Sequence, residues 1–147
     1  MQNIPEVKLG IIAVSWDCFP KVLAESRRTR VAETFGSGLI ECWITVENET
    51  DAVRAVEEVK TLGVSALVVY LGNFGPETPE TMIAELFAGP VMYCAAAEGD
   101  GDLYNGRGDT YCGMLNCSYN LNLRCAQNDW YCRAFEFSRT QSGIREY

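Results

Sequence analysis

The chain has 147 residues and a formal net charge of −8; 48% of its residues are hydrophobic and 22% are charged. This size and balance indicate one globular domain with its own core, and the negative charge disfavours nucleic acid or an anionic membrane as a partner. No apolar run is long enough to span a bilayer, and the first residues lack the basic-then-apolar pattern of a secretory signal, so we expect a cytoplasmic location.

Two residue counts limit the chemistry. The sequence has no His, so it lacks the commonest general base and the commonest transition-metal ligand, and neither a Ser-His-Asp triad nor a His-rich metal site can form within it. It has seven Cys and no CxxC pair, which in a cytosolic chain is typical of reduced, mostly buried thiols. Any chemistry must therefore rest on other side chains, or on residues from elsewhere.

The first strand and helix are predicted between residues 7 and 38. The run VKLGIIAV (7–14) is almost entirely apolar, which predicts a strand buried on both faces of a parallel sheet. A helix is expected to begin near Pro20 and to end at Gly36 or Gly38. Its expected buried positions are Val22, Leu23, Val31 and Phe35.

The same alternation continues along the chain. LIECWITV (39–46) predicts a second strand, and the next helix is expected to start with Asn48 or Thr50 as its cap and to end at Gly63. VSALVVYL (64–71) predicts a third strand, and Thr78 is the expected N-cap of the helix after it, with Pro79 at the first position. The expected core faces of these two helices are Ala52, Val53, Val56 and Val59, and Ile83, Leu86 and Phe87. PVMYCAAA (90–97) predicts a fourth strand.

This alternation predicts an α/β fold. We expect a doubly wound, flavodoxin-like or Rossmann-like parallel sheet of four to five strands with helices on both faces, in the order 2-1-3-4-5. A Gly- and Asp-rich loop follows Glu98, and then a helix over TYCGMLNCSYNLNLR is expected to pack on the sheet through residues at four-residue spacing. Those residues are Tyr111, Leu115, Tyr119 and Leu123. DWYCRAFEFS is a candidate fifth strand.

Polar and aromatic residues follow the predicted strands. Ser15-Trp16-Asp17 ends the first strand, Asn73, Phe74 and Glu77 follow the third, and Glu98 follows the fourth. Ligands of parallel sheets bind at the carboxyl edge near the topological switch point, and this mixture suits a neutral polyhydroxylated ligand. Each residue also has a structural alternative. Asp17 could cap the first helix, Glu77 could favour a helix amino end electrostatically, and Phe74 could turn into the core.

Phosphate-binding motifs are absent. The sequence has no GxxxxGK[ST] loop, and the turn after the first strand is SWDCFP rather than GxGxxG. A response-regulator phosphoacceptor Asp is also missing from the end of the third strand, which reads Leu71-Gly72-Asn73.

Several blocks of the chain resemble one known family. LGIIAVSWDCFP, YLGNFGPETPET, GPVMYCAAAE and NGRGDTYCGMLN are similar to the amino-terminal domain of the L-fucose isomerase and L-arabinose isomerase superfamily, most of all to its fucose-isomerase-like branch. The similarity covers roughly residues 7–124. We therefore expect residues 1–124 to form an isomerase-like amino-terminal α/β domain. Residues 125–147 are expected to be an atypical tail, either a fifth strand or a non-homologous extension of a truncated relative.

The resemblance implies a function. Enzymes of this family interconvert aldoses and ketoses with a divalent ion, usually manganese, whose ligands lie in later domains. The resemblance therefore implies no catalytic residue, no metal ligand and no cofactor in this chain, which is expected to be inactive alone. It implies a homo-oligomer with a sugar substrate at a subunit interface, and the loop from Gly72 to Thr78 looks like the family's lid loop. The turn Ser15-Trp16-Asp17 and the helix residues Arg27 and Arg28 are weaker candidates. The substrate-binding candidates are Trp16, Asp17, Arg27, Asn73, Phe74 and Glu77.

A second hypothesis belongs to another class. The chain could be a non-catalytic α/β module that oligomerises or binds a polyol. A shift of the melting temperature with sugars would separate binding from a purely structural role.

Overall fold

The computed structural model describes residues 6–98 and 107–128, with side chains up to Arg124. Four parallel strands form one sheet in the order β2-β1-β3-β4. The strands are β1 (Leu9–Val14), β2 (Leu39–Glu41), β3 (Ala66–Leu71) and β4 (Val91–Ala95). The helices are α1 (Lys21–Phe35), α2 (Glu49–Thr61), α3 (Glu77–Phe87) and α4 (Thr110–Asn128). None of the described helices is both long and apolar enough to cross a membrane.

The strand order confirms a doubly wound α/β sheet. Leu9 of β1 pairs with Leu39 of β2 on one side and with Ala66 of β3 on the other. The chain therefore winds outward to β2 and then returns across β1 to β3, which makes the gap between β1 and β3 the topological switch point. The predicted fifth strand lies outside the described residues, so that part of the order stays a prediction.

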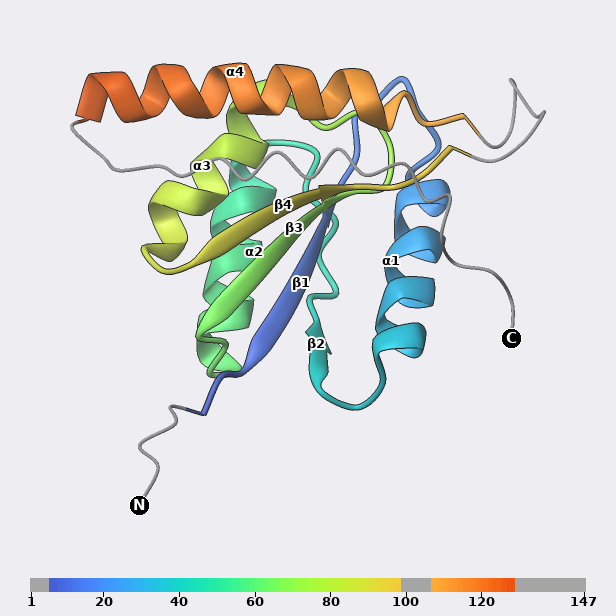
Figure 1. The fold of residues 1–147 in the computed structure, drawn as a ribbon, viewed down its shortest axis with the longest axis vertical. Helices are drawn as coiled ribbons and strands as arrows, with labels where there is room; N and C mark the ends of the chain where they lie inside the picture. The colour runs from blue at the N-terminus through green and yellow to red at the C-terminus, as the bar shows by residue number, and fades with distance from the viewer. Residues whose placement is uncertain (1–5, 99–106, 129–147) are drawn as a thin grey trace.

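Helices cover both faces of the sheet, as predicted. Figure 1 shows α1 on one side of the strands and α2 with α3 on the other. The larger core joins the side chains of one strand face to α2, α3 and α4, and it includes Ile12, Val69, Val56, Ile83 and Cys117. The smaller core lies on the opposite face and includes Ile11, Val68, Tyr70 and Val31 of α1. Helices therefore cover the sheet on both faces, which buries its apolar side chains.

The second strand is shorter than predicted. Pairing stops at Glu41, and the chain rejoins β1 only where Val46 bridges Val14. The Cys42 N–H donates to the Ile11 carbonyl, and the Val46 N–H donates to the Ala13 carbonyl. Between these two hydrogen bonds the chain advances four residues on this edge and only two on β1. The extra residues bulge outward, and Trp43 is consequently 79% exposed.

The buried face of α1 differs from the expected one. Ala24, Arg28 and Ala32 face inward, whereas Val22 and Phe35 are exposed. A small residue is needed at position 24, because the Ala24 backbone lies directly against Gly72. The Arg28 guanidinium is buried on the same side, where Nε contacts the Glu41 carboxylate at 3.1 Å and Nη1 donates to the Cys42 carbonyl. Arg28 is thus a structural link to the β2 edge.

Of the three helix starts predicted before residue 90, those near Pro20 and at Asn48 are correct and the one at Thr78 is wrong. Pro20 stands at the N-cap position of α1. The Asn48 side chain accepts a hydrogen bond from the Asp51 N–H and caps α2. Thr78 does not cap α3, because the helix already begins at Glu77 and Pro76 stands at the N-cap position. The chain enters this helix from an extended Pro76, whose fixed φ presets the first turn.

The orientation of α4 is the largest departure from expectation. The helix exists, but Tyr111, Leu115, Tyr119 and Leu123 point to solvent. The packed side is the one that carries Gly113, Cys117 and Leu121. A methyl group on Gly113 would lie 3.1 Å from the Phe74 Cα and 3.2 Å from Leu71 Cδ2, so the helix can approach β3 only through its smallest residue.

Candidate functional site

The loops after β1 and β3 meet at the switch point through one buried amide. Asn73 is fully buried. Its Oδ1 accepts the Trp16 N–H at 3.1 Å, and its Nδ2 donates to Ser15 Oγ at 2.8 Å and to the Pro20 carbonyl at 3.3 Å. Both amide hydrogens are thereby used within the protein. We therefore expect Asn73 to position Trp16 and Phe74 rather than to contact a ligand itself.

Removing this amide should destabilise the fold. We expect Asn73→Ala to lower the free energy of unfolding by about 2 kcal/mol, because the Trp16 N–H and the Ser15 hydroxyl lose a buried partner. Urea unfolding measures the change, and Glu33→Ala, at an exposed position of α1, is the control. A loss no larger than that of the control would show that the loops do not depend on this amide.

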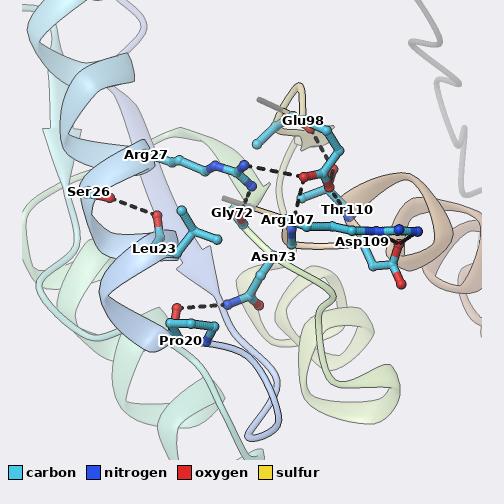
Figure 2. Close-up of polar contacts among 12 residues, drawn as sticks. Pro20, Leu23, Ser26, Arg27, Gly72, Asn73, Glu98, Arg107, Asp109 and Thr110 are labelled. Atoms are coloured by element: carbon cyan, nitrogen blue, oxygen red, sulfur yellow. Dashed lines mark hydrogen bonds and ion pairs between the residues drawn. The ribbon is translucent and has the colours of Figure 1, made fainter. Parts of the chain in front are cut away.

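An ion-paired network joins α1, the β3 loop and the end of β4 (Figure 2). Arg27 of α1 donates from Nη1 to the Gly72 carbonyl at 2.6 Å, and its Nη2 lies 3.4 Å from Glu98 Oε2. Glu98 in turn accepts the N–H groups of Gly108 and Thr110 and the Thr110 hydroxyl. Partial burial raises the pKa of Glu98, but these donors and Arg27 outweigh it and hold the pKa below its usual value.

Glycines let the β3 loop lie against its neighbours. A methyl group on Gly72 would lie 2.5 Å from the Ala24 Cα of α1, and one on Gly108 would lie 2.8 Å from the Asn73 Cα. The Phe74 N–H also donates to the Gly108 carbonyl at 2.5 Å. The loop is therefore held between α1 and the segment that leads into α4.

Aromatic rings form the half-buried surface at this edge. The Trp16 and Phe74 rings meet edge to face with centroids 5.3 Å apart, and Phe19 stacks on Phe74 at 6.3 Å. All three side chains are partly exposed, so Phe74 does not turn fully into the core. Such ring faces and edges can pack against the C–H surface of a ligand.

The two candidate carboxylates are exposed. Asp17 lies in the turn beside Trp16, and no side chain caps α1, which removes the capping alternative for Asp17. Glu77 lies in the first turn of α3, where a negative charge is favoured. Its Oε1 also accepts a hydrogen bond from Asn116 Nδ2 at 3.0 Å. Both can still accept hydrogen bonds from hydroxyl groups.

The structure thus brings Trp16, Asn73 and Phe74 together and connects Arg27 to the same loop. Sequence reasoning left Phe19 and Thr110 out of the candidates. Phe19 lies in the SWDCFP turn after the first strand, so its aromatic side chain could have marked it as a candidate site residue. Thr110 lies 12 residues after Glu98, and no sequence pattern indicates that contact.

One buried carboxyl lies beneath this edge. Glu80 of α3 is fully buried, and neither of its oxygens has a hydrogen-bond partner of ordinary geometry in the described part of the chain. Burial raises the pKa of Glu80 to about 9, the nearby Cys117 thiol lowers it in part, and the Glu77 charge raises it further. Glu80 is therefore protonated at neutral pH.

The described residues do not fit a metal centre. Across 6–98 and 107–128 no three His, Cys, Asp or Glu side chains are grouped so that they could hold an ion. Glu80 is fully buried and neutral at physiological pH, so it does not supply an anionic ligand to such a group. We derive no metal-dependent step from this chain.

Comparison with known proteins gives one match. A family model described as the fucose/sulfoquinovose isomerase N-terminal domain matches residues 10–141. The match covers most of the chain and runs past Arg124, so the boundary predicted there falls inside it and stays a prediction. Neither the curated proteins nor the solved structures contain a match to this chain.

Proposed function

Because this chain belongs to the family of fucose/sulfoquinovose isomerase N-terminal domains, we propose that it supplies part of a sugar pocket in an aldose–ketose isomerase. The carboxyl edge of the sheet forms this part, and residues outside this chain complete the pocket at a subunit interface. A manganese ion and the proton-transferring groups belong to those other residues in this proposal. The domain works in the cytoplasm.

The observation that carries the proposal is the aromatic surface flanked by carboxylates. Trp16 and Phe74 offer ring surface for the C–H side of a sugar, and Asp17 and Glu77 offer acceptors for its hydroxyl groups. Asn73 fixes the Trp16 backbone, and Arg27 fixes the Gly72 carbonyl next to it. These contacts preorganise the surface before a ligand arrives, which lowers the cost of binding.

In this proposal the chain binds the sugar and shields the reaction from water. A bound metal ion would polarise the carbonyl and hydroxyl oxygens of the sugar while a carboxylate moves protons between carbons. The exposed aromatic rings of this chain would orient the sugar and keep water from the reacting face. The purified chain alone should therefore show no manganese-dependent aldose–ketose turnover, and measurable turnover would contradict this division of roles.

Sugar binding by the isolated chain tests the proposal. We expect L-fucose, L-arabinose or sulfoquinovose to shift the Trp16 indole N–H signal in ¹⁵N spectra, with weak affinity of roughly millimolar Kd because only part of the pocket is present. Trp16→Ala lacks this indole signal, so its binding is followed on the backbone N–H of Phe74, whose ring contacts Trp16 in the wild type, and no saturable shift is expected there. Trp43→Ala is the matched control, because Trp43 is exposed on the β2 edge and lies outside the proposed pocket.

The stand-alone module without sugar binding is the competing function. It predicts no saturable shift with any pentose or hexose. It also predicts that sugar leaves the spectra of the wild type and of Trp16→Ala unchanged. That result would overturn the sugar-pocket proposal and leave the fold and family membership unchanged.

A further inference from the structure

Helix α4 is apolar on two opposite sides. Its inner side packs on the sheet and on α3 through Cys117 and Leu121. Its outer side carries Tyr111, Leu115, Tyr119 and Leu123, which are 59%, 59%, 64% and 41% exposed. We call these four residues the outer row. Contiguous exposed apolar side chains often mark an interaction site, so the outer row is a surface suited to a partner.

The outer side of α4 carries no charge that would keep a second copy away. Copies of a chain with net charge −8 repel each other, and the repulsion is weakest where a surface has no charge. Arg124 is the only charged residue of α4. It is already engaged, because its Nη1 lies 3.1 Å from Glu85 and its Nε lies 2.7 Å from Thr81 Oγ1. The outer row therefore offers an uncharged contact on a strongly acidic molecule.

The pattern of exposure on α4 is self-complementary. The exposed positions between residues 110 and 124 are Tyr111, Cys112, Leu115, Tyr119, Asn122 and Leu123. Counting from residue 117, each has an exposed counterpart at the same distance in the other direction. If two α4 helices lie antiparallel about an axis level with residue 117, Tyr111 faces Leu123, Leu115 faces Tyr119, and Cys112 faces Asn122. Every Tyr then meets a Leu, as an isologous contact requires.

We propose that α4 is the self-association face of this domain, on which a second copy packs its own α4 antiparallel across a two-fold axis level with residue 117. The proposal deepens the subunit contacts proposed above, and its functional meaning rests on them. The contact itself needs no sugar.

The size of the face sets the expected strength. Four half-exposed Tyr and Leu side chains provide roughly 400 Å² of apolar surface per copy, about half of what one partner buries in a standard interface. We therefore expect a dimer that forms at micromolar concentrations and dissociates on dilution.

Sedimentation equilibrium of the full chain without sugar tests the face. Between about 1 and 200 µM we expect the wild type to shift from monomer to dimer. Leu115→Glu should remain monomeric over this range, because it places two like charges at the contact. Val22→Glu is the control, since Val22 is an exposed apolar residue on α1 and the variant should still dimerise. Circular dichroism verifies that both variants are folded.

A cross-link tests the geometry. Asn122→Cys places a new thiol opposite Cys112 of the second copy, and mild oxidation should join these two positions between chains, as peptide mass mapping would show. The same oxidation of Ser26→Cys, on α1, should give no such link to Cys112.

The proposal is overturned if the wild type stays monomeric, if Leu115→Glu dimerises like the wild type, or if the introduced thiol at position 122 never links to Cys112. None of these outcomes bears on sugar binding at the strand edge.

Discussion

We expect the free energy of unfolding of the wild type to fall by about 4 kcal/mol between pH 5.5 and pH 8.5. Glu80→Gln is expected to remove this fall. The carboxyl is fully buried under the β3 loop, and its ordinary pKa of 4.5 rises to about 9 in the folded protein. The amino end of α3 favours a negative charge by about 0.5–1 kcal/mol. Burial outweighs this effect because water cannot reach either oxygen.

The direction of the pH dependence follows from proton uptake. Between the ordinary pKa of 4.5 and about 9 the unfolded chain carries a carboxylate, whereas the folded chain carries the neutral acid. Folding therefore takes up one proton, and each pH unit in this window lowers the free energy of unfolding by about 1.4 kcal/mol. The contribution is fully present below about pH 4.5 and is lost as the pH rises towards 9. In Glu80→Gln the side chain does not titrate.

The measurement compares slopes rather than absolute stabilities. Urea unfolding of the wild type and of Glu80→Gln at several pH values gives the two curves, and their difference isolates Glu80 even if the buried amide costs some stability at every pH. Glu57→Gln, at an exposed carboxyl of α2, should retain the wild-type slope. Parallel curves for the wild type and Glu80→Gln would mean that this carboxyl is not desolvated.

Gly72→Ala is expected to destabilise the domain by about 3 kcal/mol or more. The added methyl group would lie 2.5 Å from the Ala24 Cα and 3.0 Å from the Ala24 carbonyl oxygen. These are backbone atoms of α1, so no side-chain rotation relieves the overlap and the whole helix must move away from the sheet. That movement also pulls Arg27 from the Gly72 carbonyl.

The control for this substitution is Gly38→Ala. A methyl group there meets only the Phe35 ring, at 3.5 Å, which is an ordinary contact. We expect its stability to stay within about 0.5 kcal/mol of the wild type. Urea unfolding of both variants is the measurement. If both lose the same small amount of unfolding free energy, α1 does not pack against Gly72 as closely as described.

The β3 loop is fixed along its length, which bears on how it could serve a pocket. Gly72 is tied to Arg27, Asn73 to Trp16, Phe74 to Gly108 and Glu77 to Asn116. Opening the loop would break all of these contacts. We therefore expect it to act as a fixed wall of a pocket rather than as a moving lid, in contrast to the lid that the family resemblance suggested.

The candidate site could be predicted only in part. The sequence located the right edge, because strand ends are visible as the points where apolar runs stop. It also placed Trp16 and Phe74 in adjoining turns of that edge. The hydrogen bonds of the Asn73 amide within the protein could not be predicted, because its partners Trp16 and Pro20 lie more than 50 residues away. The role of Glu98 could not be predicted either, since its partner Thr110 lies 12 residues further along the chain and belongs to α4.

The sequence by itself determined the succession of strands and helices, the α/β class and the order of the four strands. These follow from local periodicity and short connections, which each segment carries on its own. Only the tertiary structure decided which side of α1 and α4 faces the sheet. Both helices have more than one apolar side, and the side that packs is the one whose small residues, Ala24 and Gly113, allow close approach. Steric fit at that distance outweighed the larger apolar area of the other sides, which consequently face the solvent.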